Sequence, residues 1–147
     1  MFKISERKIE LQATLNNYEH FITFIESQLT DVQMMDSEKM KVLTACEELI
    51  VNIVNYAYPN NKGNLEIIFK KKSQDVTIIF IDSGMKFNPL AKPDADTTLS
   101  IEEREIGGLG IFMVKKLMDD ISYVHKENKN HLTVTKHLHE KLIKLEK

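Results

Sequence analysis

The chain has 147 residues, of which 42% are hydrophobic and 29% are charged, and its formal net charge is -2. This composition is typical of one globular domain, and it disfavours intrinsic disorder, nucleic-acid partners and anionic membranes. A single cysteine excludes an internal disulfide. We find no signal peptide and no run of the roughly 18 apolar residues that a membrane span needs, so we expect a cytoplasmic protein.

The N-terminal half predicts one strand followed by two helices. Apolar residues alternate within an edge-type strand expected over residues 1–13. Apolar residues at helical spacing then indicate an amphipathic helix over 16–29. A second helix is expected to start near Asp36 or Ser37, either of which is a suitable cap, and to end at about Tyr58, where a proline follows.

The C-terminal half predicts two hairpins, separated by a long polar segment and a third helix. The first hairpin pairs 65–71 with 76–81. Segment 83–106 is polar, contains two prolines and has the length of a functional lid. A glycine turn then opens a helix from Ile111 to about Met118. The closing hairpin is expected to pair 121–126 with 132–137 around a loop at 127–130, and a tail is expected at 139–147.

This order of elements predicts a two-layer α+β sandwich. Strands joined mostly as hairpins indicate a mixed, mostly antiparallel sheet, and the three helices would cover one of its faces. We expect a single domain over residues 1–147, with a core at about 8–138 and a C-terminal tail at 139–147.

Polar residues recur every four positions along the second predicted helix, which is otherwise largely apolar. Thr44, Glu48, Asn52 and Tyr56 fall in one stripe, with Asn55 beside it. A carboxylate and an amide one turn apart can face one small site, where the amide oxygen suits Mg²⁺ and the carboxylate can activate a hydroxyl group. The alternative is that the stripe is the solvent-exposed side of an amphipathic helix.

Two further motifs are weak when each is read alone. In Asp82-Ser83-Gly84, the aspartate can accept a hydrogen bond from a ligand amino group and the glycine can admit a flat ring, but Asp-x-Gly is also an ordinary turn. In Gly107-Gly108-Leu109-Gly110, backbone N–H groups at a helix start can bind an anion, but a structural turn fits equally well. Arg104 can reach a phosphate or pair with its acidic neighbours.

Taken in order, these motifs resemble those of the GHKL ATPase superfamily, whose members have the Bergerat fold and a mobile ATP lid. Residues 48–59 resemble its N box, 82–89 the box after the central strand, and 104–112 the glycine box. Within the superfamily, the chain most resembles the small anti-sigma-factor serine/threonine kinases of bacterial sporulation and stress control. Tyr56 stands where that family often has histidine, and Lys86 where it often has proline.

The resemblance implies roles for individual residues. Asn52 would bind Mg²⁺, Glu48 would be the general base or orient the attacking hydroxyl, and Arg104 would lie near the γ-phosphate. Asp82 would accept a hydrogen bond from the adenine amino group. The nucleotide-binding set implied by the resemblance comprises Asn52, Asn55, Asp82, Gly84, Met85, Gly107, Gly108, Leu109, Gly110 and Ile111.

The resemblance also implies a function. The chain would be a cytoplasmic serine/threonine protein kinase that binds ATP or ADP with Mg²⁺ and regulates transcription as an anti-sigma factor. It would phosphorylate a STAS-type anti-anti-sigma protein, sequester a sigma factor and form a homodimer, without nucleic-acid or membrane partners. The alternatives are a non-catalytic ATP-binding module that controls a protein partner by binding, and a stand-alone ATPase.

Overall fold

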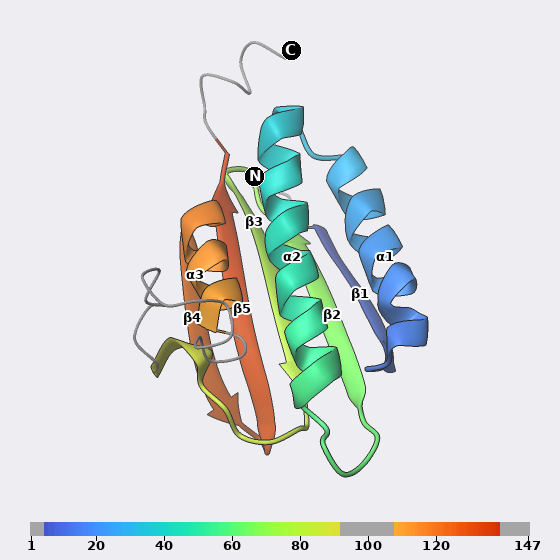
Figure 1. Cartoon of the computed structure of the whole chain (residues 1–147). Helices are drawn as coiled ribbons and strands as arrows, with labels where there is room; N and C mark the ends of the chain where they lie inside the picture. Colours follow the sequence, from blue (N-terminus) through green and yellow to red (C-terminus); the bar gives the residue numbers. More distant parts are fainter. Residues whose placement is uncertain (1–4, 92–107, 139–147) are drawn as a thin grey trace.

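The computed structural model describes residues 5–91 and 108–138. Within them, five strands form one sheet and three α-helices pack on one of its faces (Figure 1), which confirms the predicted two-layer α+β sandwich. Short 3-10 helices occur at Leu15–Asn17 and Pro89–Ala91. The main elements in chain order are β1 (Ser5–Gln12), α1 (Tyr18–Thr30), α2 (Asp36–Tyr56), β2 (Asn64–Lys71), β3 (Asp75–Asp82), α3 (Gly108–Leu117), β4 (Asp120–Lys126) and β5 (Lys129–His137).

The strands are arranged in the order β1-β2-β3-β5-β4, and every neighbouring pair is antiparallel. The last strand of the chain therefore lies inside the sheet, between β3 and β4, while β4 forms an edge. This arrangement brings the carboxyl end of β3 beside the start of β5, where Asp82 is the register partner of Asn130. The β3–β5 pairing joins segments that no hairpin connects, and it shapes the candidate site.

The turn between β4 and β5 is tighter than the sequence predicts. Glu127 and Asn128 have positive φ angles of 55° and 60°, as in the two-residue turns that match the twist of a hairpin. Lys126 and Lys129 therefore already pair across the two strands. The prediction that Asn130 belongs to the loop is wrong, because the chain reverses within two residues and β5 begins at Lys129.

The core lies between the sheet and the helices. Residues of β2, β3 and β5 alternate along each strand, and the buried ones face the helical layer. Helix α2 lies between α1 and α3 across the sheet (Figure 1) and contacts both. Residues that are at most 1% exposed include Phe21, Ile25, Val42, Leu49, Ile50, Leu65, Ile67, Val76, Ile78, Phe80, Val114 and Val134.

Helix α2 starts at Asp36, as predicted, but its N-cap differs from the prediction, and helix α3 starts earlier than predicted. Met35 occupies the N-cap of α2 and its carbonyl oxygen accepts bonds from the N–H groups of Glu38 and Lys39, so neither Asp36 nor Ser37 is the cap. Asp36 and Glu38 instead lie in the first turn, where a negative charge complements the helix dipole. Helix α2 ends at Tyr56. Helix α3 begins at Gly108, so the motif residues from Gly108 to Gly110 belong to the helix rather than to a turn before it.

Lys136 joins three elements of the fold. Its side chain is 8% exposed, and Nζ lies 3.1 Å from Glu38 Oε2 at the start of α2. The same ammonium group donates a 3.0 Å hydrogen bond to the carbonyl oxygen of Leu117 at the end of α3. The hydrogen bond from Lys136 is the largest cause that lowers the pKa of Glu38. Lys136 thus fixes the start of α2 and the end of α3 to β5.

Replacing Lys136 with methionine should lower the free energy of unfolding by about 2–4 kcal/mol, because Glu38 and a carbonyl oxygen lose their buried partner. The depressed pKa of Glu38 stabilises the folded state above the ordinary value of 4.5, and this contribution is lost as the pH falls below it. In denaturant unfolding, the difference in the free energy of unfolding between the wild type and the variant should therefore become smaller as the pH is lowered towards about 4.

A matched control is Lys70→Met, because the ion pair of Lys70 with Glu6 is a surface pair with side chains 35% and 56% exposed. That variant should change stability by less than about 1 kcal/mol. Equal losses in both variants would contradict the role assigned to Lys136.

Within residues 5–91 and 108–138, no helix is both long and apolar enough to cross a membrane.

Candidate functional site

Three predicted motifs converge at one end of the molecule. The carboxyl end of α2, the carboxyl end of β3 and the start of α3 all lie in the lower part of Figure 1. Helix α2 is the common support, because α3 packs on it and the loop after β3 crosses its last turn. The structure therefore brings together three segments that are well separated in the sequence, which end or start at Tyr56, Asp82 and Gly108.

Glu48 and Asn52 face the first turn of α3. A Cβ atom built on Gly110 would lie 3.0 Å from Glu48 Oε2 and 3.3 Å from Asn52 Nδ2, so the glycine leaves room beside both side chains. Both residues are half-buried. The polar stripe of α2 is therefore not simply a solvent-exposed helix face at these two positions. A carboxylate, an amide and the N-terminal N–H groups of a helix share one small region.

Asp82 ends β3 as a buried carboxylate with 7% exposure. Its Oδ1 accepts hydrogen bonds from the backbone N–H of Gly84, at 2.9 Å, and from Asn130 Nδ2, at 3.0 Å. Burial is the largest influence and raises the pKa of Asp82, whereas these two hydrogen bonds lower it. Among the described residues, both bonds go to the same oxygen, which leaves Oδ2 available as an acceptor for a ligand.

Gly84 lies where the chain crosses the end of α2. A Cβ atom at this position would be 2.2 Å from the carbonyl oxygen of Ala57, and the next residue, Met85, donates its N–H to that same oxygen at 3.0 Å. The glycine is thus required for backbone packing against α2, a reason that the sequence pattern does not reveal. Met85 itself is 58% exposed beside this crossing.

Sequence reasoning missed two residues that hold the loop after Asp82. Tyr58 donates its hydroxyl to the carbonyl oxygen of Asn64 at 2.6 Å and accepts the N–H of Ser83 at 2.8 Å. Asn130 contacts Asp82, Met85, Phe87 and Tyr123 through its amide group. No local signal marks either role, because Ser83 is 25 residues from Tyr58, and Asp82, Met85 and Phe87 are more than 40 residues from Asn130.

The remaining predicted site residues have different surroundings. Asn55 is exposed near the end of α2, whereas the side chain of Ile111 is 7% exposed and belongs to the core. Gly108 is the first residue of α3. Arg104, Gly107 and the side chain of Leu109 lie outside what the structure describes, as does most of the predicted lid. Among the described residues, no three His, Cys, Asp or Glu side chains form a metal-binding group.

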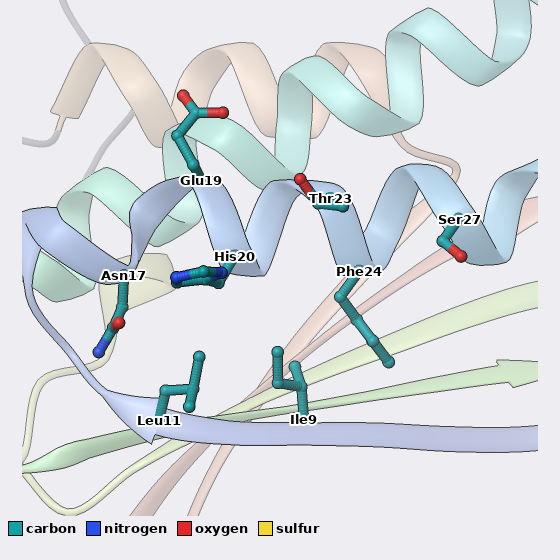
Figure 2. Close-up of a pocket in the computed structure, with 8 residues that line it drawn as sticks. All are labelled: Ile9, Leu11, Asn17, Glu19, His20, Thr23, Phe24 and Ser27. Atoms are coloured by element: carbon teal, nitrogen blue, oxygen red, sulfur yellow. The ribbon is translucent and has the colours of Figure 1, made fainter.

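A separate hollow of about 610 Å³ lies between α1 and β1 (Figure 2). Side chains of β1, of the 3-10 helix at Leu15–Asn17 and of α1 line it, and none of the predicted site residues is among them. The candidate site is therefore not this groove. Its lining consists of Ile9, Leu11, Asn17, Glu19, His20, Thr23, Phe24 and Ser27.

The two site glycines should respond differently to alanine. Gly84→Ala forces a methyl group against the backbone of Ala57, so we expect a loss of about 2–4 kcal/mol in the free energy of unfolding. Gly110→Ala meets only the ends of the Glu48 and Asn52 side chains, which can move, so the loss should stay below about 1 kcal/mol. Thermal unfolding of both variants tests this, and equal losses would contradict it.

Comparisons with known proteins identify the family of this chain. Residues 11–136 match the family described as the histidine kinase-like ATPase domain. The chain is similar to the serine-protein kinase RsbW of Bacillus mycoides, with 32% identity over 96 residues, which cover 63% of this chain and 59% of that protein. It is also similar to the serine/threonine-protein kinase BtrW of Bordetella bronchiseptica, with 27% identity over 97 residues, which cover 65% of this chain and 68% of that protein.

The fold has a known counterpart as well. The crystal structure of the RsbU and RsbW domains of Rv1364c from Mycobacterium tuberculosis superposes with a TM-score of 0.62 and 18% identity, over 91% of this chain and 32% of that one. The chain thus spans 59% of the RsbW relative's length and about a third of the solved structure. Because the family match extends over residues 11–136 and the fold agrees, the protein belongs to the histidine kinase-like ATPase domain family.

Proposed function

We propose that this chain binds ATP with Mg²⁺ and transfers the γ-phosphoryl group to a serine or threonine of a protein partner. The observation that carries the proposal is the packing of Gly110 against Glu48 and Asn52, which unites the start of α3 with the polar stripe of α2. The family of ATPase domains and the kinase names of the two relatives support this function.

The described residues fit a nucleotide and its metal ion. The Asn52 amide oxygen is a hard ligand of the kind Mg²⁺ prefers, and Gly110 leaves space beside it for a phosphate. The N–H groups at the start of α3, from Gly108 to Gly110, would bind phosphate oxygens. Asp82 would accept a hydrogen bond from the adenine amino group. The rest of the proposed nucleotide-binding set is Asn55, Gly84, Met85, Gly107, Leu109 and Ile111.

In this proposal Glu48, whose carboxylate lies beside Gly110, serves the acceptor hydroxyl next to the proposed phosphate site. In the proposed step, the hydroxyl oxygen of the partner attacks the γ-phosphorus, the bond to the β-phosphate oxygen breaks, and ADP leaves. Glu48 takes up the hydroxyl proton or orients the hydroxyl group. Bound Mg²⁺ would neutralise phosphate charge, and Arg104 would stabilise the transferring group.

The proposed partner is a STAS-type anti-anti-sigma protein, and the regulated protein is a sigma factor that the chain sequesters as a cytoplasmic homodimer. These proposals rest on the family resemblance of the motifs. They also include a single domain over residues 1–147 and an ATP lid over 83–106, most of which lies outside the described residues.

Calorimetric titration with ATP and ADP, with and without Mg²⁺, tests the binding step. We expect saturable binding, and Asn52→Ala should abolish the effect of Mg²⁺ on it. Incubation with γ-labelled ATP and a STAS-domain protein then tests the transfer. Binding without labelling of the partner would favour a non-catalytic ATP-binding module, and release of free phosphate without an acceptor protein would favour an ATPase. The absence of nucleotide binding at millimolar concentration would refute the proposal.

A further inference from the structure

Asn130 is a buried polar residue at the start of β5. It is 6% exposed and lies on the helix-facing side of the sheet, opposite Asp82 on β3 and opposite His125 on β4. A buried amide in this layer is unusual, because the following helix-facing residues of the strand, Leu132 and Val134, are apolar. Its presence therefore calls for a physical reason.

The amide group of Asn130 uses its whole hydrogen-bonding capacity within the protein. Nδ2 donates to Asp82 Oδ1 at 3.0 Å and to the carbonyl oxygen of Met85 at 2.9 Å. Oδ1 accepts the N–H of Phe87 at 3.3 Å and the hydroxyl of Tyr123. An amide has two donor hydrogens and two acceptor lone pairs, so all four are occupied.

These contacts determine how the amide is oriented and what it can do. A rotation that exchanged its oxygen and nitrogen would set the NH₂ group against the N–H of Phe87 and the oxygen against Asp82 and Met85, so only one orientation fits. Because no donor or acceptor is left over, Asn130 has no capacity for a ligand. Its influence on the site must pass through the residues that it holds.

We propose that Asn130 is the positioning residue that gives the site its preference for adenine, by holding Asp82 Oδ1 and the backbone from Met85 to Phe87 so that Asp82 Oδ2 is left for the amino group of the base. This inference rests on the proposed binding of ATP. Asn130 lies on β5, a strand outside all three sequence motifs.

The charge of Asp82 supports this role. Burial favours the protonated carboxyl, which would present a donor instead of an acceptor, whereas the hydrogen bond from Asn130 lowers the pKa of Asp82. Asn130 thus helps to keep the carboxylate ionised in a buried place. Guanine carries an oxygen where adenine carries its amino group, so an ionised carboxylate at this point repels guanine and attracts adenine.

A purely structural role for Asn130 predicts a different outcome from a positioning role. If the residue only stabilised the loop, its replacement would weaken binding of every nucleotide alike. If it positions Asp82, the loss should fall on ATP, since the phosphates that ATP and GTP share bind at α3. The ratio of the dissociation constants for GTP and ATP therefore distinguishes the two roles.

The test compares Asn130→Asp with Asn128→Asp, titrated with ATP and GTP in the presence of Mg²⁺. Asn130→Asp keeps the shape of the side chain but sets a carboxylate against Asp82 Oδ1 and the Met85 carbonyl oxygen. Asn128→Asp adds the same charge at an exposed turn residue two positions away. The φ angle of Asn128 is positive, and aspartate tolerates a positive φ angle. Thermal unfolding without nucleotide shows that each variant is folded.

We expect Asn130→Asp to weaken ATP binding by about 10- to 100-fold and to change GTP binding by less than about threefold, while Asn128→Asp keeps the wild-type ratio. Should Asn130→Asp fail to fold, Asn130→Ser provides the same comparison with a smaller loss. An unchanged ratio in a folded variant would overturn the inference and leave the proposed ATP binding intact. A wild type that binds neither nucleotide would overturn both.

Discussion

Glu48→Gln should lower the rate of phosphoryl transfer by about 10²- to 10⁴-fold, the usual contribution of a general base. Glutamine keeps the size of the side chain beside Gly110 but cannot accept the hydroxyl proton. Because Glu48 is assigned to the acceptor hydroxyl and not to the nucleotide, the dissociation constant for ATP should stay within about threefold. Single-turnover labelling of the partner protein and calorimetry measure the two quantities separately.

The neighbouring residue offers a matched control. Glu47 is half-buried, and its pKa is raised chiefly by burial and by the negative charges of Glu26, Glu48 and Glu19, two of which belong to α1. Glu47→Gln makes the same chemical change one position away and should leave the transfer rate near that of the wild type. Unchanged transfer in Glu48→Gln would exclude Glu48 as the base, and a large loss of ATP affinity would show that it contacts the nucleotide instead.

Asp82→Asn should have opposite effects on binding and on stability. We expect ATP affinity to fall by about 100-fold, because the amide presents a donor where the adenine amino group needs an acceptor. The melting temperature of the free protein should rise by about 2–4 °C, which corresponds to roughly 1 kcal/mol. The asparagine oxygen can still accept the bonds from Gly84 and Asn130.

The stability gain follows from the sign of the pKa shift. The pKa of Asp82 in the folded state is raised above its ordinary value of 3.8, so the folded protein holds the proton more tightly than the unfolded chain does. Ionisation therefore costs stability, the cost is absent below pH 3.8, and it is complete once the pH exceeds the folded-state pKa. At neutral pH the asparagine variant escapes this cost, so its advantage should disappear as the pH is lowered to about 3.8.

An exposed aspartate on the edge strand serves as the control. Asp120→Asn removes one negative charge outside the core and should change neither ATP affinity nor the melting temperature appreciably. If Asp82→Asn binds ATP as the wild type does, Asp82 is not the adenine acceptor. If its melting temperature falls instead, the hydrogen bonds to the carboxylate outweigh the cost of burying the charge.

Local patterns of residues predict the types of the secondary-structure elements and the residue types at their ends. Helical spacing in α1 and apolar runs in β2 and β3 are local patterns, so they predicted the two-layer sandwich. The motifs around Glu48, Asp82 and Gly110 are also local, because each can be identified from its own residues and the three follow one another in the expected order. The N-cap of α2 was predicted wrongly because Asp36 and Ser37 both suit a cap position. The backbone hydrogen bonds to the carbonyl oxygen of Met35 identify Met35 as the cap.

Which segments meet in space follows from the packing of the whole fold. Alternation in β5 shows which residues share a face, but it does not say that β5 pairs with β3, and this pairing alone sets Asn130 against Asp82. The contact between Gly110 and Glu48, and that between Gly84 and Ala57, likewise join distant segments through packing. Such contacts depend on shape and hydrogen bonding across elements, which no local pattern of residue types encodes.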